Sequence, residues 1–476
     1  MQWTVGKVGD ALQIGVPWTL THKLLAGFSI DSRSLKPGEL FVALKGPRFD
    51  GHDFVPQALD NGAPVALVSE ERRMTYPPTM FNRLIGVLDT FQALQQLARF
   101  ARQTWGRALI GVTGSTGKTT TKDLLAALLA TRHNVLQSAG NLNNEYGVPL
   151  TLLRLRPQHE LAVLEMAMTR KGELAKLCAV ARPNIGLVTN VAPVHLEFFR
   201  SVEEIAEAKR ELIQNLAQPA IAVLNADDSR VARFQEGFGG KVYRFAIEQP
   251  ADVRVENLAD HGLAGSEFDL VVGRKRARAR LPLPGRAYVE NALAAFAVAS
   301  LLKLEPAEAV PVFAAVEPLP LRGQRLRFAS GFTVVNDAYN CNPRALGLMA
   351  EALSRTPEAQ RRILVVGEMK ELGPASPELH RQAGTTIAGL GNIDFLAGVT
   401  GHARYLVEGA AAAGLPADRA RFFDTKEAAG DWLGAFVQPG DWVLLKASRA
   451  IALETLLDAL RARFPVEPAP ALKGGG

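Results

Sequence analysis

Two long regions of the sequence alternate short, continuously apolar segments with stretches of helical spacing. In the first region these segments are RALIGV, NVLQSA, LAVLEMA, NIGLVTNV and AIAVLNA. The alternation returns from about Phe332, in FTVVND, RRILVVGE, IDFLAG and DWVLLKA. Strands that are apolar along their whole length are typical of parallel sheets covered by helices on both faces. The sequence therefore predicts an α/β fold with two parallel-sheet units.

The remaining segments are organised differently. Near the start, GFSIDSR, ELFVALKG and PVALVS read as strands around one helix and predict a smaller α/β unit. Residues Asp89–Gln103 have helical apolar spacing and are predicted to form a linker helix. Residues Val253–Arg280 alternate apolar and polar side chains, which predicts a β-rich excursion. The Pro- and Gly-marked segment Val316–Gln324 predicts a domain boundary.

These patterns divide the 476 residues into three domains. We predict a small α/β domain at 1–86, a linker helix at 87–107, a central parallel-sheet domain at 108–317, a Rossmann-like α/β domain at 318–466 and a disordered tail at 467–476. The net charge of +6 is too small to indicate a nucleic-acid partner, and no apolar run is long enough to span a bilayer. The two cysteines, Cys178 and Cys341, provide no disulfide framework. We therefore expect a cytoplasmic monomer that binds no nucleic acid and does not insert into membranes.

The segment GVTGSTGKTTTKDLL begins at Gly111 and lies between a predicted strand and a predicted helix. A strand, a glycine loop and a helix start direct backbone N–H groups and the positive end of the helix dipole at an anion. Lys118 would then reach the terminal phosphates of a nucleotide, and the Thr119 hydroxyl would bind Mg²⁺. Val112 stands where the general pattern G-x-x-x-x-G-K-[ST] has its first glycine, so this loop is shortened.

Two further side chains could meet this loop. Glu165 lies at the end of LAVLEMA and His195 follows NIGLVTNV, and ligand-binding residues gather beyond the carboxyl ends of parallel strands. Taken alone, a glutamate at a strand end is most often solvated and a single histidine most often structural, so their pattern leaves both roles open. Lys209 lies among glutamates in SVEEIAEAKRELI, and its own pattern predicts a solvent-exposed lysine.

A set of motifs in chain order resembles the Mur ligases, the ATP-dependent amide-forming enzymes of peptidoglycan synthesis. GSTGKTT matches the shortened loop of that family, and it is followed by GNLNNEYGVP, HLE, AKREL, ENALAA, NDAYNCNP, GEMKELG and LKASR. DSRSLKPGELFVALKGPRFDGHDF resembles the family's UDP-sugar-binding domain. The likeness is greatest to the members that join D-Ala-D-Ala to UDP-N-acetylmuramoyl-tripeptide through an acyl phosphate, which gives UDP-MurNAc-pentapeptide, ADP and phosphate.

The resemblance implies roles for residues at matching positions. The ATP-binding set would comprise Gly114, Ser115, Thr116, Gly117, Lys118, Thr119 and Thr120 at the phosphates, Asn291 at the adenine and Asp337 at the ribose. The Mg²⁺ ligands would be Thr119, Glu165, His195 and carbamylated Lys209. Carbamylation answers a physical need, because an ammonium cannot ligate a cation whereas a carbamate can.

The same resemblance implies an arginine at the γ-phosphate and a group of substrate contacts. The family's usual Gly-Arg is here Gly323-Gln324-Arg325, so we assign the phosphate contact to Arg325, with Arg322 as the alternative. The residues expected to face the UDP-sugar peptide are Asp31, Ser32, Arg33, Asn143, Asn144, Asn340 and Asn342.

Two other functions stay open at this point. Another amide ligase of the same superfamily would add diaminopimelate or lysine, but the Asp-Asn-Pro-Arg motif of the diaminopimelate-adding enzyme has no match in the expected place. A nucleotide-switched binding protein would use the loop without ligation, which would leave Glu165 and His195 without a purpose. The basic run GRKRARARL is predicted to be one exposed face of a strand, and Cys341 a packing residue.

Overall fold

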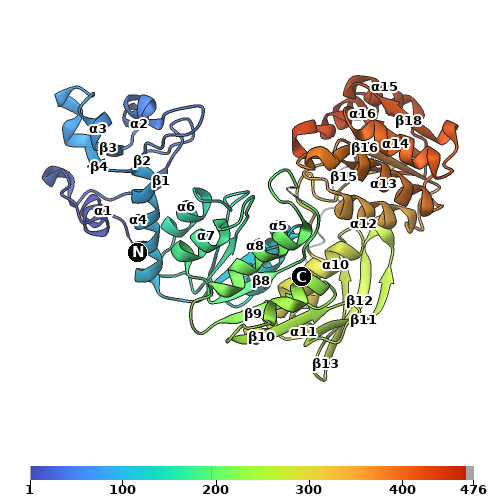
Figure 1. Ribbon diagram of the computed structural model, residues 1–476, viewed down its shortest axis with the longest axis horizontal. Helices are drawn as coiled ribbons and strands as arrows, with labels where there is room; N and C mark the ends of the chain where they lie inside the picture. The colour runs from blue at the N-terminus through green and yellow to red at the C-terminus, as the bar shows by residue number, and fades with distance from the viewer. Residues whose placement is uncertain (1, 195, 468–476) are drawn as a thin grey trace.

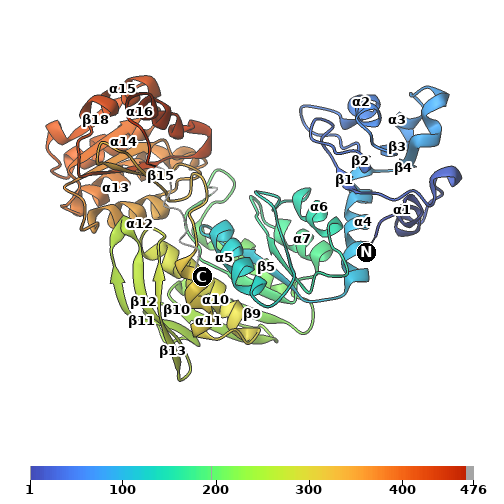
Figure 2. The same ribbon diagram turned by 180° about the vertical axis from the view of Figure 1, so that it is seen from behind.

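The computed structural model describes residues 2–194 and 196–467 and contains three sheets that follow one another along the chain. The first and third sheets lie at opposite ends of the molecule with the second between them (Figure 1), and the reverse view shows the same arrangement (Figure 2). The predicted α/β class with three sheet-containing units is confirmed. Residues 468–476 of the predicted tail lie outside the described residues.

The N-terminal sheet is small and entirely parallel, with the order β1-β2-β3-β4. Its strands are β1 (Gly27–Ser29), β2 (Glu39–Val42), β3 (Ala66–Ser69) and β4 (Leu84–Val87), and its helices are α1 (Val5–Leu12), α2 (Val55–Asp60) and α3 (Glu70–Arg73). Alternate residues of β2 and β3 enter two apolar clusters, one formed with α1 and one with α2, so both faces are covered. The sequence predicted β1 to β3 but not the short, glycine-containing β4.

Helix α4 (Thr90–Trp105) is the predicted linker helix, and it joins the first two units. The Asp89 carboxylate accepts hydrogen bonds from the N–H groups of Phe91 and Gln92 and so begins the helix, and Gly106 ends it in a left-handed conformation. One face packs on α1, while α6 (Gly147–Leu153) and α7 (Glu173–Ala181) cover another (Figure 1). This helix therefore attaches the N-terminal sheet to the central unit through buried side chains.

The central sheet has nine strands in the order β13-β12-β11-β10-β9-β8-β5-β7-β6, and all neighbours from β11 to β6 run parallel. The strands are β5 (Leu109–Thr113), β6 (Val135–Gln137), β7 (Leu161–Glu165), β8 (Ile185–Val188), β9 (Ile221–Asn225), β10 (Lys241–Ala246), β11 (Val253–Asp260), β12 (Ser266–Val272) and β13 (Lys275–Leu281). The other helices of this unit are α5 (Lys118–Ala130), α8 (Val202–Gln214), α9 (Ser229–Ala232), α10 (Arg286–Leu301) and α11 (Pro306–Ala314). Successive residues of β5 enter the cluster under α5 and α10 and the cluster under α7 and α8 in turn, as expected for a sheet covered on both faces.

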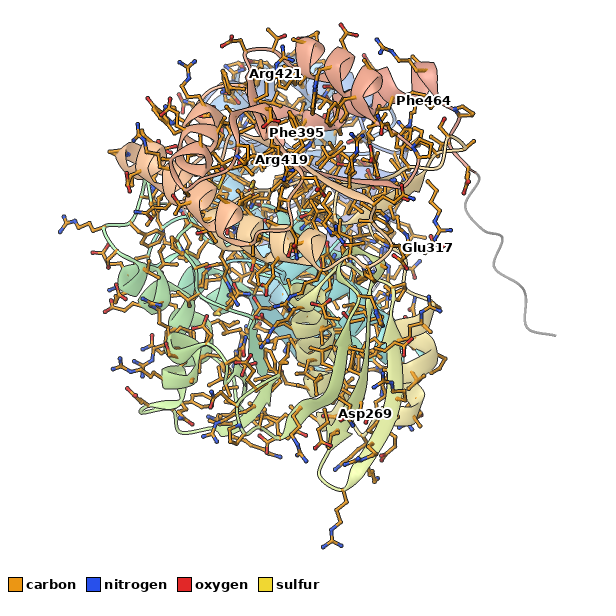
Figure 3. All side chains as sticks on the ribbon, turned by 90° about the vertical axis from the view of Figure 1, so that its right-hand side faces the viewer. Asp269, Glu317, Phe395, Arg419, Arg421 and Phe464 are labelled. Atoms are coloured by element: carbon orange, nitrogen blue, oxygen red, sulfur yellow. The ribbon has the colours of Figure 1, made fainter. Side chains whose placement is uncertain are left out.

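The predicted β-rich excursion is the antiparallel end of this sheet, β11 to β13. On β13 the basic side chains face outward and pair with acidic neighbours: Arg276 lies 2.9 Å from Glu256, and Arg278 lies 3.5 Å from Asp269, which Figure 3 labels near the β12–β13 hairpin. Acidic neighbours in the sheet therefore offset much of this positive charge. The prediction of one exposed strand face is confirmed.

The C-terminal sheet has the order β14-β15-β19-β16-β17-β18, and β14 is its one antiparallel strand. The strands are β14 (Gln324–Arg327), β15 (Thr333–Asp337), β16 (Arg361–Gly367), β17 (Phe395–Val399), β18 (Ala420–Phe423) and β19 (Asp441–Lys446), and the helices are α12 (Pro343–Ser354), α13 (Ser376–Gly389), α14 (Ala403–Ala412), α15 (Lys426–Phe436) and α16 (Leu456–Arg463). Helices α12 to α14 pack on one face and α15 and α16 on the other.

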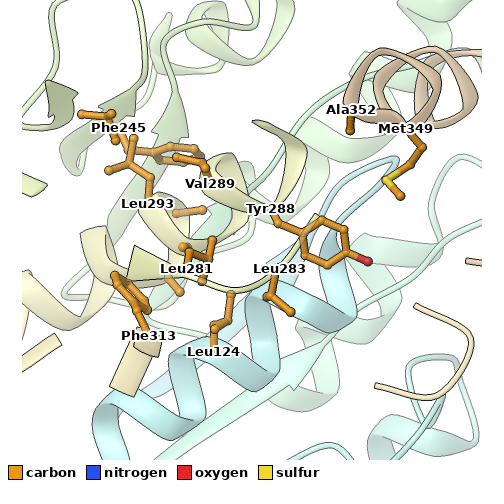
Figure 4. Close-up of a cluster of buried hydrophobic side chains, with 14 of the residues drawn as sticks. Leu124, Phe245, Leu281, Leu283, Tyr288, Val289, Leu293, Phe313, Met349 and Ala352 are labelled. Atoms are coloured by element: carbon orange, nitrogen blue, oxygen red, sulfur yellow. The ribbon is translucent and has the colours of Figure 1, made fainter. Parts of the chain in front are cut away.

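The central and C-terminal units share an apolar contact. Met349 and Ala352 of α12 belong to the same buried apolar cluster as Leu283 and Tyr288 of the central unit (Figure 4). Helix α12 also contacts α10, so the two units meet along these helices. In the part of the chain that the structure describes, no helix is long and apolar enough to cross a membrane. From the positions of the elements we propose domain boundaries close to residues 87, 107 and 317.

Candidate active site

A cavity of about 410 Å³ lies where the central and C-terminal units meet. The central unit contributes the glycine loop, Glu165 and the start of α10, and the C-terminal unit contributes the end of β15, the start of α12 and the end of β19. These strand ends are carboxyl ends of parallel sheets, where ligand sites of such sheets form.

The glycine loop connects β5 to α5 and follows a path that side chains would block. Gly114 and Gly117 have φ values of +149° and +81°. A Cβ at Gly117 would lie 2.1 Å from Asn291 Oδ1, and one at Gly114 would lie 1.9 Å from Thr189 Oγ1. Both positions therefore favour glycine. The loop ends at Gly117, and α5 begins at Lys118 with its first three residues lining the cavity.

Residues that follow β8 hold the loop in place. The Thr116 N–H and hydroxyl both donate to Asn190 Oδ1 at 3.0 Å, and the Thr189 hydroxyl donates to the Thr116 carbonyl at 2.6 Å. The Ser115 hydroxyl accepts a 2.8 Å hydrogen bond from the Ala192 N–H. The loop conformation is thus specified by the neighbouring strand end as well as by its glycines.

Lys118 curls over the loop that precedes it. Its Nζ donates to the Gly114 carbonyl at 2.8 Å. Burial lowers the pKa of Lys118, the Arg322 charge acts in the same direction, and Glu165 opposes both. An arriving phosphate would favour the charged ammonium, because an anion beside it offsets the loss of water.

Glu165 and Thr119 meet as the sequence predicted. The Thr119 hydroxyl donates to Glu165 Oε2 at 2.7 Å, and the Asn143 amide donates to Glu165 Oε1 at 2.8 Å. Glu165 is buried, yet it lines the cavity with Thr119 and Asn143. Hydroxyl and carboxylate oxygens side by side are the donors that Mg²⁺ prefers. Residues 2–194 and 196–467 contain no group of three or more His, Cys, Asp or Glu side chains arranged to hold a metal.

Lys209 is buried, so the prediction of an exposed lysine from its glutamate-rich helix is wrong. Its side chain lies on the inner face of α8, and burial lowers its pKa well below the ordinary value, with the Lys118 charge acting in the same direction. The amine is therefore held toward its neutral form close to the loop lysine. His195, the remaining predicted metal ligand, lies outside the described residues.

Asp337, at the end of β15, is paired with Lys446, a residue for which no role was predicted from the sequence. Lys446 Nζ lies 2.6 Å from Asp337 Oδ2 and donates to the Asn340 carbonyl at 2.8 Å. Across the junction, the Asp337 charge and burial together raise the pKa of Tyr288 well above its ordinary value, with burial the larger cause. Lys446 could have been found by the rule that located Glu165, since it too ends a parallel strand.

Arg322 and Arg325, the two candidates for the phosphate contact, lie in different places. Arg322 lines the cavity, and its guanidinium lies 3.8 Å from the Tyr339 ring centroid. Arg325 lies on β14, beyond the turn at Gly323, and is not among the described residues that line the cavity. Of these two arginines, Arg322 is the one that shares the cavity with the glycine loop.

The predicted substrate residues fall into two groups. Asn143, Asn340 and Asn342 line the cavity, whereas Asp31, Ser32, Arg33 and Asn144 do not belong to the described cavity lining. The first three of that second group follow β1 in the N-terminal unit. Asn144 accepts a 2.9 Å hydrogen bond from the Gly147 N–H at the start of α6.

Asn342, Asn291 and Cys341 are all buried at or beside the cavity. Asn342 accepts a 3.0 Å hydrogen bond from the Ala345 N–H and begins α12. Asn291 lines the cavity and accepts a 3.4 Å hydrogen bond from the Thr121 hydroxyl. Burial raises the pKa of the Cys341 thiol to about 12, which suits the predicted packing role because a thiol rather than a thiolate is favoured.

Family profiles match three successive parts of the chain. They describe the Mur ligase family, catalytic domain, at residues 25–102, the Mur ligase middle domain at 112–299, and the Mur ligase, glutamate ligase domain, at 321–449. The chain is 36% identical over 436 residues to the UDP-N-acetylmuramoyl-tripeptide--D-alanyl-D-alanine ligase of Synechocystis, which covers 91% of this chain and 92% of that protein.

Solved structures show the same likeness. MurF from Acinetobacter baumannii superposes with a TM-score of 0.85 at 29% identity, over 97% of this chain and 99% of that one. The MurF ligase of Thermotoga maritima in complex with ADP superposes with a TM-score of 0.80 at 30% identity, over 92% and 97%.

Proposed function

Because this chain belongs to the Mur ligase family, we propose that it joins D-Ala-D-Ala to UDP-N-acetylmuramoyl-tripeptide, converting ATP to ADP and phosphate and giving UDP-MurNAc-pentapeptide for peptidoglycan. The observation that carries this function is likeness to enzymes of that name over nine-tenths of the chain. A diaminopimelate- or lysine-adding ligase and a nucleotide switch are not favoured, because curated relatives 33–36% identical over nine-tenths of the chain carry the D-alanyl-D-alanine name.

The reaction must activate a carboxylate, which is a poor electrophile. We infer that the γ-phosphoryl group of ATP is transferred to an oxygen of the tripeptide's terminal carboxylate, which gives an acyl phosphate and ADP. The amine of D-Ala-D-Ala then attacks the carbonyl carbon, the bond from that carbon to the phosphate oxygen breaks, and inorganic phosphate and the amine proton leave. The protein's contribution is to position two anions and offset their charge.

We assign residues that line the cavity to each part of ATP. The backbone N–H groups of Gly114–Thr120 and the Lys118 ammonium would hold the phosphates at the positive end of α5. Arg322 would offset the charge that develops at the γ-phosphate. Asn291 would contact the adenine and Asp337 the ribose, since both line the same cavity from opposite units.

Thr119 and Glu165 fit a magnesium ion, and we propose them with carbamylated Lys209 and His195 as its ligands. Among the described residues, the charged side chains that line the cavity are four basic ones, Lys118, Arg322, Lys370 and Lys446, and four acidic ones, Glu165, Glu290, Asp337 and Glu371. An ATP tetra-anion entering an electrically balanced cavity needs additional positive charge. When bound, Mg²⁺ supplies that charge and polarises the phosphoryl oxygens.

Carbamylation of Lys209 requires a neutral amine, because only the free electron pair of Nζ can attack CO₂. Burial favours that neutral form. The attack forms an N–C bond and releases one proton, and the product carries oxygens that could ligate a cation. We further propose that the UDP-sugar peptide is contacted by Asp31, Ser32, Arg33, Asn143, Asn144, Asn340 and Asn342. We also propose a cytoplasmic monomer.

A turnover assay tests the function. The purified protein is supplied with ATP, Mg²⁺ and UDP-N-acetylmuramoyl-tripeptide, and ADP release is followed with D-Ala-D-Ala, diaminopimelate, lysine or no amine. We expect ADP release that depends on D-Ala-D-Ala, with pentapeptide product detected by mass spectrometry. Release without any amine and without product would favour a nucleotide switch, and release with diaminopimelate or lysine would assign the chain to another ligase of the family.

A further inference from the structure

An ion pair crosses the junction between the central and C-terminal units beside the cavity. Arg344, in the first turn of α12, directs Nη2 at both oxygens of Glu290 on α10, at 3.4 and 3.2 Å. The Glu290 side chain is 13% exposed and that of Arg344 30% exposed. The pair therefore connects two units in a place with little water, where a charge contact is stronger than on an open surface.

The Glu290 carboxylate also reaches the residues that hold the glycine loop. Its Oε1 accepts hydrogen bonds from the Asn225 amide at 2.8 Å and the Asn190 amide at 3.4 Å. Asn190 Oδ1 in turn accepts from the Thr116 N–H and hydroxyl, both at 3.0 Å. Glu290 thus stands between the arginine of α12 and the loop that would hold the phosphates.

A second route runs in parallel through Asn225. Its amide nitrogen, which donates to Glu290, also donates to the Thr189 carbonyl at 2.8 Å. The Thr189 hydroxyl donates to the Thr116 carbonyl at 2.6 Å. Movement of the Glu290 carboxylate would therefore disturb both the side chain and the backbone carbonyl of one loop residue, Thr116.

The charges around Glu290 make Arg344 necessary. Burial raises the pKa of Glu290, Asp228 and Asp227 push it in the same direction, and Arg344 opposes them. Arg344 Nη1 lies 4.0 Å from Asp228, so one guanidinium faces both acids. Without Arg344, the Glu290 carboxylate would depend more strongly on its hydrogen bonds from Asn190 and Asn225. Alternatively it would take up a proton and become a weaker acceptor.

We propose that Glu290 and Arg344 are positioning residues that couple the seating of the C-terminal unit to the conformation of the phosphate loop. When α12 is seated, Arg344 holds Glu290, and Glu290 holds Asn190 and Asn225 against the loop. When α12 moves away, Glu290 loses its counter-charge and the loop loses part of its support. This inference rests on the proposed use of ATP by the same cavity, and it assigns two residues for which neither contact with ATP nor metal ligation is proposed.

A double-mutant cycle tests the coupling, with Arg344→Met, Glu290→Gln and the double variant compared with the parent protein. Two readouts are needed: kcat/KM for ATP in the ligation assay, and the Kd for ADP by calorimetry, which requires no acceptor substrate. We expect Arg344→Met to lower kcat/KM for ATP about tenfold, a loss typical of a largely buried charged hydrogen bond. The double variant should be no worse than the worse single variant, and Arg344→Lys should recover part of the loss.

Arg355→Met is the matched control. Arg355 directly follows α12 and also crosses the junction, to Asp260 at 3.5 Å, but its side chain is 52% exposed. Asp260 Oδ1 accepts a hydrogen bond from the Gly262 N–H rather than from a residue of the glycine loop. We expect less than a twofold change for this variant. A similar loss in Arg355→Met and Arg344→Met would overturn the inference, since it would report loosened packing of α12 in general. Unchanged ADP affinity and kcat/KM in both Arg344→Met and Glu290→Gln would also overturn it.

The two readouts separate this inference from the proposed function. A parent protein that binds ADP but makes no product with D-Ala-D-Ala would refute the function, and the calorimetric cycle would still decide the coupling. A parent protein that makes product, with additive effects in the cycle, would keep the function and refute the coupling. If Arg344→Met does not fold, Arg344→Lys and Glu290→Gln provide the same comparison.

Discussion

Replacing Lys446 by methionine should expose how much the C-terminal unit depends on one buried ion pair. Lys446 Nζ lies 2.6 Å from the Asp337 carboxylate, and the two side chains are 3% and 12% exposed. Methionine keeps the apolar stem and removes the charge, so Asp337 would remain buried without its counter-charge. Removing one partner of a buried pair costs about 3–5 kcal/mol, and we expect the lower end because Asp337 retains some access to water. For a unit of this size that corresponds to a fall of roughly 6–12 °C in the unfolding midpoint.

Thermal unfolding followed by circular dichroism measures this effect, and two variants control it. Lys171→Met removes a lysine of an exposed pair with Glu207, whose side chains are 68% and 63% exposed, and should change the midpoint by less than about 2 °C. The double variant Lys446→Met/Asp337→Asn removes both charges and should recover most of the lost stability, because no isolated buried charge remains. A Lys446→Met midpoint within 2 °C of the parent, or a double variant at least as unstable as the sum of its parts, would refute the reasoning.

Four further outcomes can be checked by the turnover assay and by urea titration. Lys118→Ala should abolish amine-dependent ADP release, and near-normal turnover would remove the phosphate role of the loop. Lys209→Ala should lose activity and regain part of it with added acetate; full activity at low Mg²⁺ would contradict the carbamate. Arg322→Ala should lower kcat by about 10²–10³-fold, the size of a lost transition-state donor, while Arg325→Ala stays near the parent, and the reverse order would contradict the placement of these side chains. His380 is fully buried between the loop after β16 and the start of α13, where its ring accepts from the Met369 N–H at 3.0 Å, so His380→Leu should lower the free energy of unfolding by about 1–3 kcal/mol in urea titration.

The sequence predicted the inner strands of the two larger sheets because those strands are apolar along their whole length. β10, β14 and β18 were not predicted, and the reason is physical: their burial patterns mix exposed and half-buried positions, so they form no apolar run. Strands of this kind become ordered by pairing with a neighbour distant in the chain. Local composition carries little of that information.

The position of a residue could be predicted where it follows from a strand end, but not where it depends on tertiary contacts. Glu165 and Thr119 meet at 2.7 Å because β5 and β7 are parallel neighbours. Lys209 was expected to be exposed because glutamates surround it in sequence, but α8 turns it toward the core. The choice between Arg322 and Arg325 depends on the turn at Gly323, where φ is +71°, and spacing alone does not fix that turn.

The shortened glycine loop has a consequence for the site that its motif alone does not reveal. Val112, which stands where the general pattern has its first glycine, is fully buried inside β5, and the strand continues to Thr113. Its partner across the sheet is Glu165 on β7. Because the chain stays in the sheet up to this point, only Gly114–Gly117 separate the strand from α5, and Thr119 in the first turn of α5 comes within a hydrogen bond of Glu165. A glycine at position 112 would weaken the strand where it pairs with the acidic residue. The valine therefore acts with the glycines that follow it: it keeps β5 paired with β7 up to Glu165, and the short loop then brings Thr119 of α5 to that carboxylate.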